Sequence, residues 1–358
     1  MPLVKTIDML AECARGKYAV GAFNINSLDQ APFLIKKAEE LKSPILIVEP
    51  GVIEPYMNFE DYANVTARAA RDAKVPVGIH LSHGLNLEQT ERAIKAGFTS
   101  VMYDGSKLPY EENVRTTKIA VEMGHKMGCA VEGELGALGS SFVSISETMT
   151  DPALARDFVE RTGVDILAVA IGNAHGFYKG TPALDFKRLE EIKYAIAPYP
   201  CYLTLHGGSG IPFDHIRRAI DMGIVKICIY TEMCHEGRKN GMAWFKDHPD
   251  YTGNFDTPDL NAAIMSGYTK AMESSMDMFM SIGKAGADMP SIEVEKKTFT
   301  TTAMPTVAAP AATGMPLGNP LATTGDIPVN TDIGPAFPSL VAENHNFKST
   351  GRYWDKNL

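Results

Sequence analysis

Residues 164–176 read VDILAVAIGNAHG, an apolar run followed by a short segment that contains Gly172, His175 and Gly176. A continuous run of Val, Ile, Leu and Ala is typical of a strand buried on both faces of a parallel sheet, and glycine marks the turn that follows it. Two other stretches have the same form: residues 75–84, VPVGIHLSHG, and residues 200–210, PCYLTLHGGSG. Each predicts a buried strand that opens into a loop at a histidine.

His83, His175 and His206 thus occupy the same place in three separate strands. The ends of parallel strands meet at one edge, so three imidazoles there can form a His₃ zinc site with one position open for substrate. For any one histidine, the alternative is a hydrogen-bonded residue near the core. The repetition in three strands favours the metal site.

The rest of the chain alternates strand-like and helix-like patterns. Eight βα units of this spacing predict a (β/α)₈ barrel, an α/β fold whose active site lies at the C-terminal ends of its strands. The expected helices are residues 29–41, 87–96, 110–127, 152–162, 185–195 and 212–222. The expected strands are residues 19–25, 44–49, 76–80, 100–104, 130–135, 166–171, 202–205 and 225–230.

Composition excludes several classes of protein. The chain has 358 residues, a formal net charge of -9 and a pI near 5.5, without the basic clusters that nucleic-acid phosphates require. Neither a signal peptide nor an apolar run of about 18 residues is found, so a cytoplasmic protein that acts on small molecules is expected, with no membrane partner. The five scattered cysteines indicate reduced thiols.

The composition changes after the predicted barrel. A long helix is expected over residues 258–285, with Met265, Met272 and Met276 among the apolar residues at helical spacing. This stripe favours core or subunit packing over an adaptable binding surface. We therefore divide the chain into a catalytic barrel, residues 1–287, and a Pro-, Ala- and Thr-rich extended arm, residues 288–358. The arm is expected to dock on its own or a neighbouring subunit of a homo-oligomer, a dimer or tetramer.

Over residues 1–286 the sequence resembles the class II, zinc-dependent ketose-bisphosphate aldolases, especially the fructose- and tagatose-bisphosphate branch. Together the motifs are highly specific for this scaffold, and they extend from the first strand to the last. They are GAFNINSLDQ, HLSHG, VMYDGSKLPYEENV, VEGELGALG, LAVAIGNAHGFYKG, LHGGSG and VKICIYTEM.

The resemblance implies Zn²⁺ as cofactor, with His83, His175 and His206 as ligands. It implies Glu134, in EGELG, as a carboxylate that is an alternative ligand in some members. Glycine-rich loops let backbone N–H groups approach an anion, and a helix N-terminus favours negative charge, which agrees with a phosphate site before the helix expected near Pro212. The residues implied to bind the phosphorylated sugar are Asn24, Gly176, Lys179, Gly207, Gly208, Ser209, Tyr230 and Thr231.

The chain departs from the family at three places that handle protons or substrate. The family's HLDHG motif has an aspartate where this chain has Ser82, and that aspartate exchanges a proton with the hydroxyl beside the cleaved bond. A glycine-rich loop that usually supplies an acidic residue has Phe142 and Val143 at the acidic positions, and the usual asparagine of the last strand is Cys228. Loss of a positioned acid or base costs on the order of 10² to 10⁴ in rate, so we expect weak cleavage of the ordinary bisphosphate.

Other residues can replace the missing groups. Glu49, at the end of the second predicted strand, is a candidate base if its carboxylate points into the barrel mouth; a loop acid or an ion-pair partner is the alternative. Cys228 and Tyr230 alternate onto one face, where the thiol can be a weak acid and the phenol a donor. His80 is a structural residue or a proton relay to Ser82.

The sequence therefore predicts a divergent zinc-dependent aldehyde-lyase of carbohydrate metabolism that acts on a phosphorylated ketose through a metal-stabilised enediolate. The first alternative is an epimerase or isomerase, which needs proton transfer only beside the carbonyl. The second is a non-catalytic sugar-phosphate binding or assembly subunit, with the C-terminal arm as its partner contact.

Overall fold

The computed structural model of the chain describes residues 3–136, 149–178, 180–253 and 257–286. The predicted C-terminal arm, Lys179 and the loop positions Phe142 and Val143 lie outside these residues.

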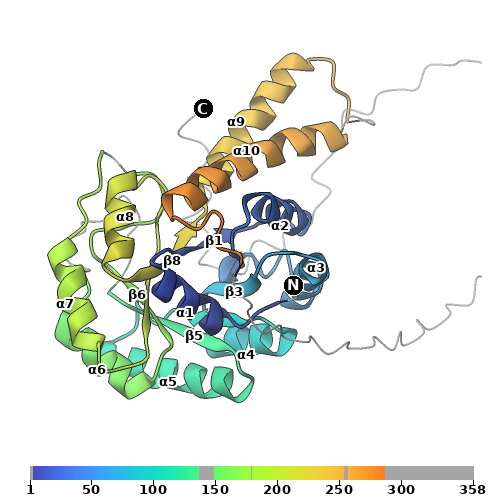
Figure 1. Ribbon diagram of the computed structural model, residues 1–358. Helices are drawn as coiled ribbons and strands as arrows, with labels where there is room; N and C mark the ends of the chain where they lie inside the picture. The colour runs from blue at the N-terminus through green and yellow to red at the C-terminus, as the bar shows by residue number, and fades with distance from the viewer. Residues whose placement is uncertain (1–2, 137–148, 179, 254–256, 287–358) are drawn as a thin grey trace, which may run out of the picture. The chain divides into compact units, whose positions relative to one another are not determined.

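Eight parallel strands close into a barrel in chain order, and helices surround it (Figure 1), so the predicted (β/α)₈ barrel is confirmed. Each predicted strand exists. The strands are β1 (Val20–Asn24), β2 (Ile45–Pro50), β3 (Val77–Gly84), β4 (Ser100–Tyr103), β5 (Ala130–Leu135), β6 (Ile166–Val169), β7 (Tyr202–Leu205) and β8 (Ile224–Ile229).

The helices include three that the sequence interpretation did not name: α1, α3 and α9. Helices α3, α4, α6 and α7 each begin after a residue whose side chain accepts a backbone N–H, which satisfies groups that a helix start leaves free. The helices are α1 (Thr6–Gly16), α2 (Gln30–Leu41), the 3₁₀ turn η1 (Gly51–Ile53), α3 (Phe59–Arg71), α4 (Leu87–Ala96), α5 (Tyr110–Lys126), α6 (Pro152–Thr162), α7 (Phe186–Ile196), α8 (Phe213–Asp221), α9 (Thr231–Asp247) and α10 (Thr257–Met278).

Alternation along the strands separates two layers of buried apolar residues. On β2, Leu46 and Val48 belong to a cluster inside the barrel, whereas Ile45 and Ile47 belong to the cluster between strands and helices. The inner cluster also contains Met9 and other residues of α1, so α1 closes the N-terminal end of the barrel. The open end is therefore the C-terminal one.

Helices α9 and α10 pack along each other and extend beyond the ring of helices around the barrel (Figure 1). The methionine stripe of α10 is buried, with Met272 and Met276 0% exposed, and it belongs to the main apolar core. The core-packing interpretation of this stripe is confirmed. The helix ends at Met278, seven residues before the predicted end at Ala285.

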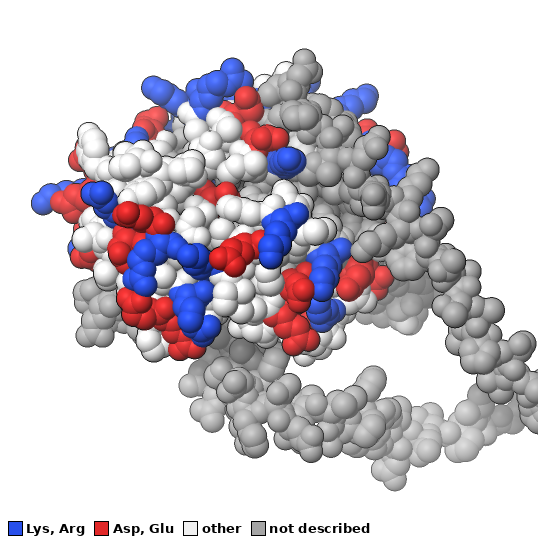
Figure 2. All heavy atoms as spheres, turned by 90° about the horizontal axis from the view of Figure 1, so that it is seen from below, with Lys and Arg blue, Asp and Glu red and all other residues white. Residues whose placement is uncertain are grey.

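Charges of both signs are mixed on the face of the molecule that is seen from below (Figure 2). Figure 2 shows basic and acidic side chains interspersed over one face, without a broad area of one sign. Among the described residues, no helix is long and apolar enough to cross a membrane.

Candidate metal centre and active site

Three histidines meet at the C-terminal mouth of the barrel. His83 is the next-to-last residue of strand β3, His206 directly follows β7, and His175 lies in the loop after β6. Nε2 of His83 lies 3.2 Å from Nε2 of His175 and 3.1 Å from Nδ1 of His206. The structure thus brings together residues that are 92 and 123 positions apart in sequence.

An unusual backbone conformation turns His83 into the mouth. His83 has φ of 50°, in the left-handed region that non-glycine residues rarely adopt. The pairing of β3 with β4 is irregular at the same place, between Leu81 and Gly84. This irregularity changes the side-chain alternation at the last residues of β3, which re-aims the imidazole.

Hydrogen bonds define which nitrogen of two rings faces the others. Nδ1 of His83 lies 2.8 Å from the Asp104 carboxylate, and Nε2 of His206 lies 2.7 Å from the Glu132 carboxylate. Since a carboxylate only accepts, each of these nitrogens carries the proton when the ring is neutral. His83 Nε2 and His206 Nδ1 then present lone pairs to each other at 3.1 Å, an arrangement that calls for a cation between them.

The geometry fits a tetrahedral metal ion. Zinc–nitrogen bonds of 2.0–2.1 Å at the tetrahedral angle place ligand nitrogens about 3.3 Å apart, close to both observed separations. The three histidine nitrogens all lie within 4.8 Å of one another. His83, Asp104 and Glu134 form a second group that meets the same criterion, with Glu134 Oε2 3.8 Å from His83 Nδ1.

The electrostatics keep two of the three imidazoles neutral, as metal binding requires. Burial, with the neighbouring His83 and His206, lowers the pKa of His175 to about 3. Burial also lowers the pKa of His206 to about 4, against the opposing effect of Glu132. For His83, burial lowers the pKa, but the hydrogen bond to Asp104 and the nearby Glu134 carboxylate outweigh it, so its pKa is raised.

Residues that the sequence analysis missed join the loops that carry His175 and His206. The Asn173 amide donates to the backbone oxygens of Val169 and His206, at 3.2 and 3.0 Å. The Tyr178 hydroxyl accepts from the Ala174 N–H and donates to the Gly207 oxygen. Asp104 and Glu132 were also missed, although Glu132 shares the inward face of β5 with Glu134 by two-residue alternation.

The predicted phosphate-binding residues gather beside the histidines on these loops. Gly207 has φ of 65°, and a Cβ there would lie 2.2 Å from the Ala174 oxygen, so the two loops approach too closely for another residue. The Ser209 hydroxyl accepts from the Glu232 N–H at the start of α9, next to Thr231. Gly176 and Gly208 lie on the same loops, and Lys179 lies outside the described residues.

Three further predicted residues lie on the inward face. Asn24 ends β1 in phase with Ala22 of the inner cluster, and its Oδ1 is buried without a hydrogen-bond partner among the described residues. Cys228 belongs to the inner cluster on β8, and burial raises the pKa of its thiol to about 11. At neutral pH this thiol therefore keeps its proton. Ser82, on β3, is buried and 1% exposed.

The expected position of Tyr230 is wrong. Strand β8 ends at Ile229, and Tyr230 has φ of -142° and ψ of -58°, so it leaves the alternation that relates it to Cys228. Its hydroxyl instead lies 3.4 Å from the Asn26 amide, which donates to it. Burial raises the pKa of Tyr230 to about 12.

The expected orientation of Glu49 is also wrong. Glu49 continues the outward phase of Ile47 and pairs with Leu81, which belongs to the outer cluster. It is 0% exposed, and neither carboxyl oxygen has a hydrogen-bond partner among the described residues. Burial, with smaller contributions from two nearby glutamates, raises its pKa to about 9, so Glu49 is a neutral buried acid and not a base at the mouth.

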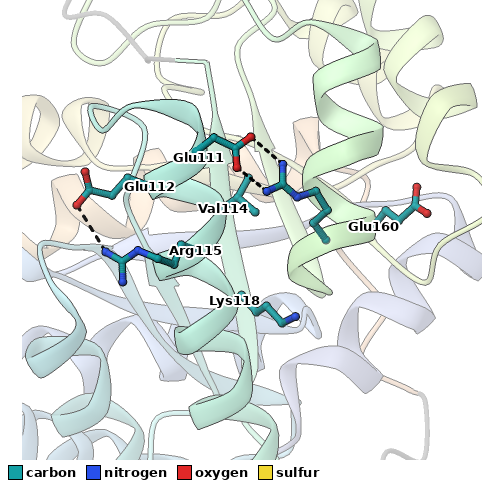
Figure 3. A pocket seen from close by; sticks show the side chains of 7 residues that line it. Glu111, Glu112, Val114, Arg115, Lys118 and Glu160 are labelled. Atoms are coloured by element: carbon teal, nitrogen blue, oxygen red, sulfur yellow. Dashed lines mark hydrogen bonds and ion pairs between the residues drawn. The ribbon is translucent and has the colours of Figure 1, made fainter.

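A separate hollow of about 800 Å³ lies on the outer wall between α5 and α6 (Figure 3). Its charges pair with one another: Arg161 with Glu111 at 2.6 Å, and Arg115 with Glu112 at 3.7 Å. None of its seven lining residues is one of the three histidines. The metal-binding geometry is therefore at the barrel mouth.

The chain is similar to known proteins over most of its length. Residues 4–284 match the family described as class-II fructose-bisphosphate aldolase. The fructose-bisphosphate aldolase of Geobacillus stearothermophilus is 44% identical over 238 residues, which are 65% of this chain and 82% of that protein. A probable fructose-bisphosphate aldolase of Bacillus subtilis is 43% identical over 239 residues, with the same two shares.

Solved structures show the same relationship. The YdjI aldolase from Escherichia coli K12 superposes with a TM-score of 0.67 and 34% identity, over 79% of this chain and 99% of that one. A putative fructose-1,6-bisphosphate aldolase from Coccidioides immitis superposes with a TM-score of 0.70 and 29% identity, over 78% and 98%. The chain belongs to the class II fructose-bisphosphate aldolase family. It is an aldehyde-lyase of the class II type.

The buried Glu49 leads to a prediction about stability. The unfolded chain releases this proton above the ordinary pKa of 4.5, whereas the folded chain holds it to about 9, so the Glu49 term destabilises the fold progressively as pH rises between these values. The Gln side chain of Glu49→Gln cannot ionise. The free energy of unfolding of this variant, relative to that of the parent, should therefore increase with pH by up to about 1.4 kcal/mol per pH unit. Urea unfolding at pH 5 and pH 8 measures this.

Aldolase turnover should stay within a few-fold of the parent in this variant. Glu54→Gln is the matched control, because Glu54 is paired with Arg92 and should show no such gain. If Glu49→Gln and the parent differ in stability by the same amount at both pH values, or if the variant loses a hundredfold in turnover, the assignment of Glu49 as an outward-facing neutral acid is wrong.

Proposed function

We propose that this chain is a divergent zinc-dependent aldolase that cleaves or forms a carbon–carbon bond in a phosphorylated ketose. The observation that carries the proposal is the convergence of the three histidine nitrogens at the mouth of the barrel, at separations of 3.1 and 3.2 Å. His83 Nε2, His175 Nε2 and His206 Nδ1 would hold the ion. Zinc, when bound, polarises the ketose carbonyl and the adjacent hydroxyl, and so stabilises an enediolate.

The phosphate of the substrate is assigned to the adjoining loops. Ser209 and Thr231 lie where the loop after β7 meets the N-terminus of α9, and a helix N-terminus attracts anions. Gly176 and Gly207 have φ of 90° and 65°, the left-handed backbone conformation that occurs in anion-binding turns. Asn24 supplies an amide oxygen from β1 for a substrate hydroxyl. Lys179 is proposed as a further phosphate contact from its place in the sequence.

Proton transfer is where this enzyme is proposed to differ from its relatives. Ser82 stands where the family aspartate exchanges a proton with the substrate hydroxyl, and serine remains protonated near neutral pH. Glu49 faces the outer layer, and the Cys228 thiol holds its proton to a pKa of about 11, so neither replaces a carboxylate base. Cleavage of the ordinary bisphosphate is therefore expected to be slow.

An epimerase or isomerase is the second candidate, favoured by the same departure at Ser82. Moving a proton beside the carbonyl needs the stabilised enediolate but not the base at the next hydroxyl. Product analysis separates the possibilities: two fragments indicate an aldolase and an isomer of equal mass an epimerase. Tight binding without turnover would indicate the third candidate, a binding subunit.

We also propose that the protein acts in the cytoplasm as a homo-oligomer, a dimer or tetramer, as expected for an enzyme of sugar-phosphate metabolism. The acidic, interspersed surface charge supports a small-molecule substrate.

The metal assignment predicts close to one zinc ion per purified chain, bound by three histidine side chains. His206→Ala should lose most of the zinc, as measured by elemental analysis after dialysis. His125→Ala is the control, because His125 lies on the outer helix α5 and pairs with Asp165. Unchanged zinc in His206→Ala would refute the assignment.

The Ser82 assignment predicts poor cleavage of fructose 1,6-bisphosphate by the parent. Ser82→Asp restores a carboxylate at the family position and should raise the cleavage rate by on the order of 10², the lower range for a positioned base. Ser82→Asn, of the same size but without basicity, should not. A coupled assay of triose phosphate release measures all three proteins, and rapid cleavage by the parent would show that Ser82 is no handicap.

A further inference from the structure

A continuous chain of polar side chains crosses the barrel interior beneath the histidine site. We call it the buried polar chain: Ser100, His80, Lys226, Glu132 and His206, from β4, β3, β8, β5 and the end of β7. Each of the five residues is 0% or 1% exposed. The successive contacts are His80 Nδ1 to Ser100 Oγ at 2.8 Å, Lys226 Nζ to His80 Nε2 at 2.9 Å, Lys226 Nζ to Glu132 Oε2 at 2.6 Å, and His206 Nε2 to Glu132 Oε1 at 2.7 Å.

Stability alone does not account for these residues. A buried ammonium and a buried carboxylate both lose their hydration, and a well-packed apolar pair of similar volume is often as stable or more stable. The barrel interior nearby is apolar, with Val20, Leu46 and Ile166 in the same enclosed layer. The buried polar chain ends at His206, a proposed metal ligand, and we therefore look for its role in what it does to this side chain.

Donor and acceptor rules set the direction of every contact. Lys226 only donates, so His80 Nε2 accepts and the His80 proton lies on Nδ1, where it is given to Ser100. On the other side, Glu132 accepts from Lys226 through Oε2 and from His206 through Oε1. The His206 proton is therefore held on Nε2, and its Nδ1 lone pair is turned toward His83 Nε2.

We infer that Lys226 and Glu132 are positioning residues that hold His206 in the tautomer and ring orientation needed to bind the metal. Lys226 acts through Glu132: it is 2.6 Å from Glu132 Oε2 and so prevents this carboxylate from rotating away from the imidazole. Lys226 and Glu132 thus contribute to the affinity for the metal, although neither is a ligand. The inference rests on the proposed zinc site.

The test is zinc affinity, measured by competition with a chromogenic chelator on the full chain. Glu132→Gln and Lys226→Met should each weaken zinc binding by on the order of 10- to 100-fold, the usual effect of removing a partner of a metal-binding histidine. When cobalt(II) replaces zinc, both variants should also show a visible absorption band that differs from the parent's in position or intensity, because the His206 ring is no longer held. Thr204→Val is the matched control: Thr204 is 0% exposed, and within the described residues its hydroxyl bonds the Lys226 backbone oxygen and no side chain of the buried polar chain, so the variant should leave both readouts unchanged.

Lys226→Met alone leaves an uncompensated buried carboxylate and can fail to fold. The double variant Lys226→Met/Glu132→Met removes both charges, and it should keep the parent's circular dichroism while binding zinc as weakly as the single variants. Parent-like zinc affinity and cobalt spectrum in the double variant would overturn the inference. If His206→Ala also retains zinc, the proposed metal site itself fails, so the two failures are distinguishable.

Discussion

Closure of the parallel barrel is the constraint on which the site depends. Hydrogen bonding of β1 to β8 forces all eight strand ends to surround one mouth, while α1 fills the opposite end. His83, His175 and His206 meet because each lies at, or shortly after, the C-terminal end of a strand of this ring. A small change in strand register would separate them, since one residue of slip turns a side chain to the other face.

The mouth and the barrel interior beneath it concentrate charged and hydrogen-bonded groups, whereas the other buried layers are mainly apolar. Asp104 and Glu132 orient two histidines, and each carboxylate has a pKa well below its usual range although burial opposes this, because imidazole, hydroxyl or ammonium groups face it. Such groups are expensive to bury singly and acceptable when every donor meets an acceptor. A metal ion would complete this arrangement, because it takes up the lone pairs that His83 and His206 direct at each other.

The candidate metal-binding residues match the family pattern, whereas the residues that would transfer protons depart from it. The three histidines and their carboxylate partners are all present and well placed. In the proposed function, Ser82 stands at the position of the family aspartate. The candidate replacements are directed outward, like Glu49, or protonated, like Cys228. On that proposal the scaffold retains the means to stabilise an enediolate, and the proton carrier is what would distinguish this chain from its relatives.

Sequence alone determined the barrel, the three histidines and their placement at strand ends, because strand periodicity and the glycine that follows are local properties. It also predicted the buried stripe of α10, through helical spacing. The unnamed helices α1, α3 and α9 were missed, and so were Asp104, Glu132 and Asn173, whose roles depend on neighbours distant in the chain. Only the tertiary structure decided that Glu49 faces outward and that Tyr230 leaves its strand, because the inward or outward phase of a strand's last residues depends on packing and on where the strand ends. The left-handed backbone conformation of His83 was also decided by the tertiary structure, because no local sequence signal requires it and the surrounding barrel holds it in place.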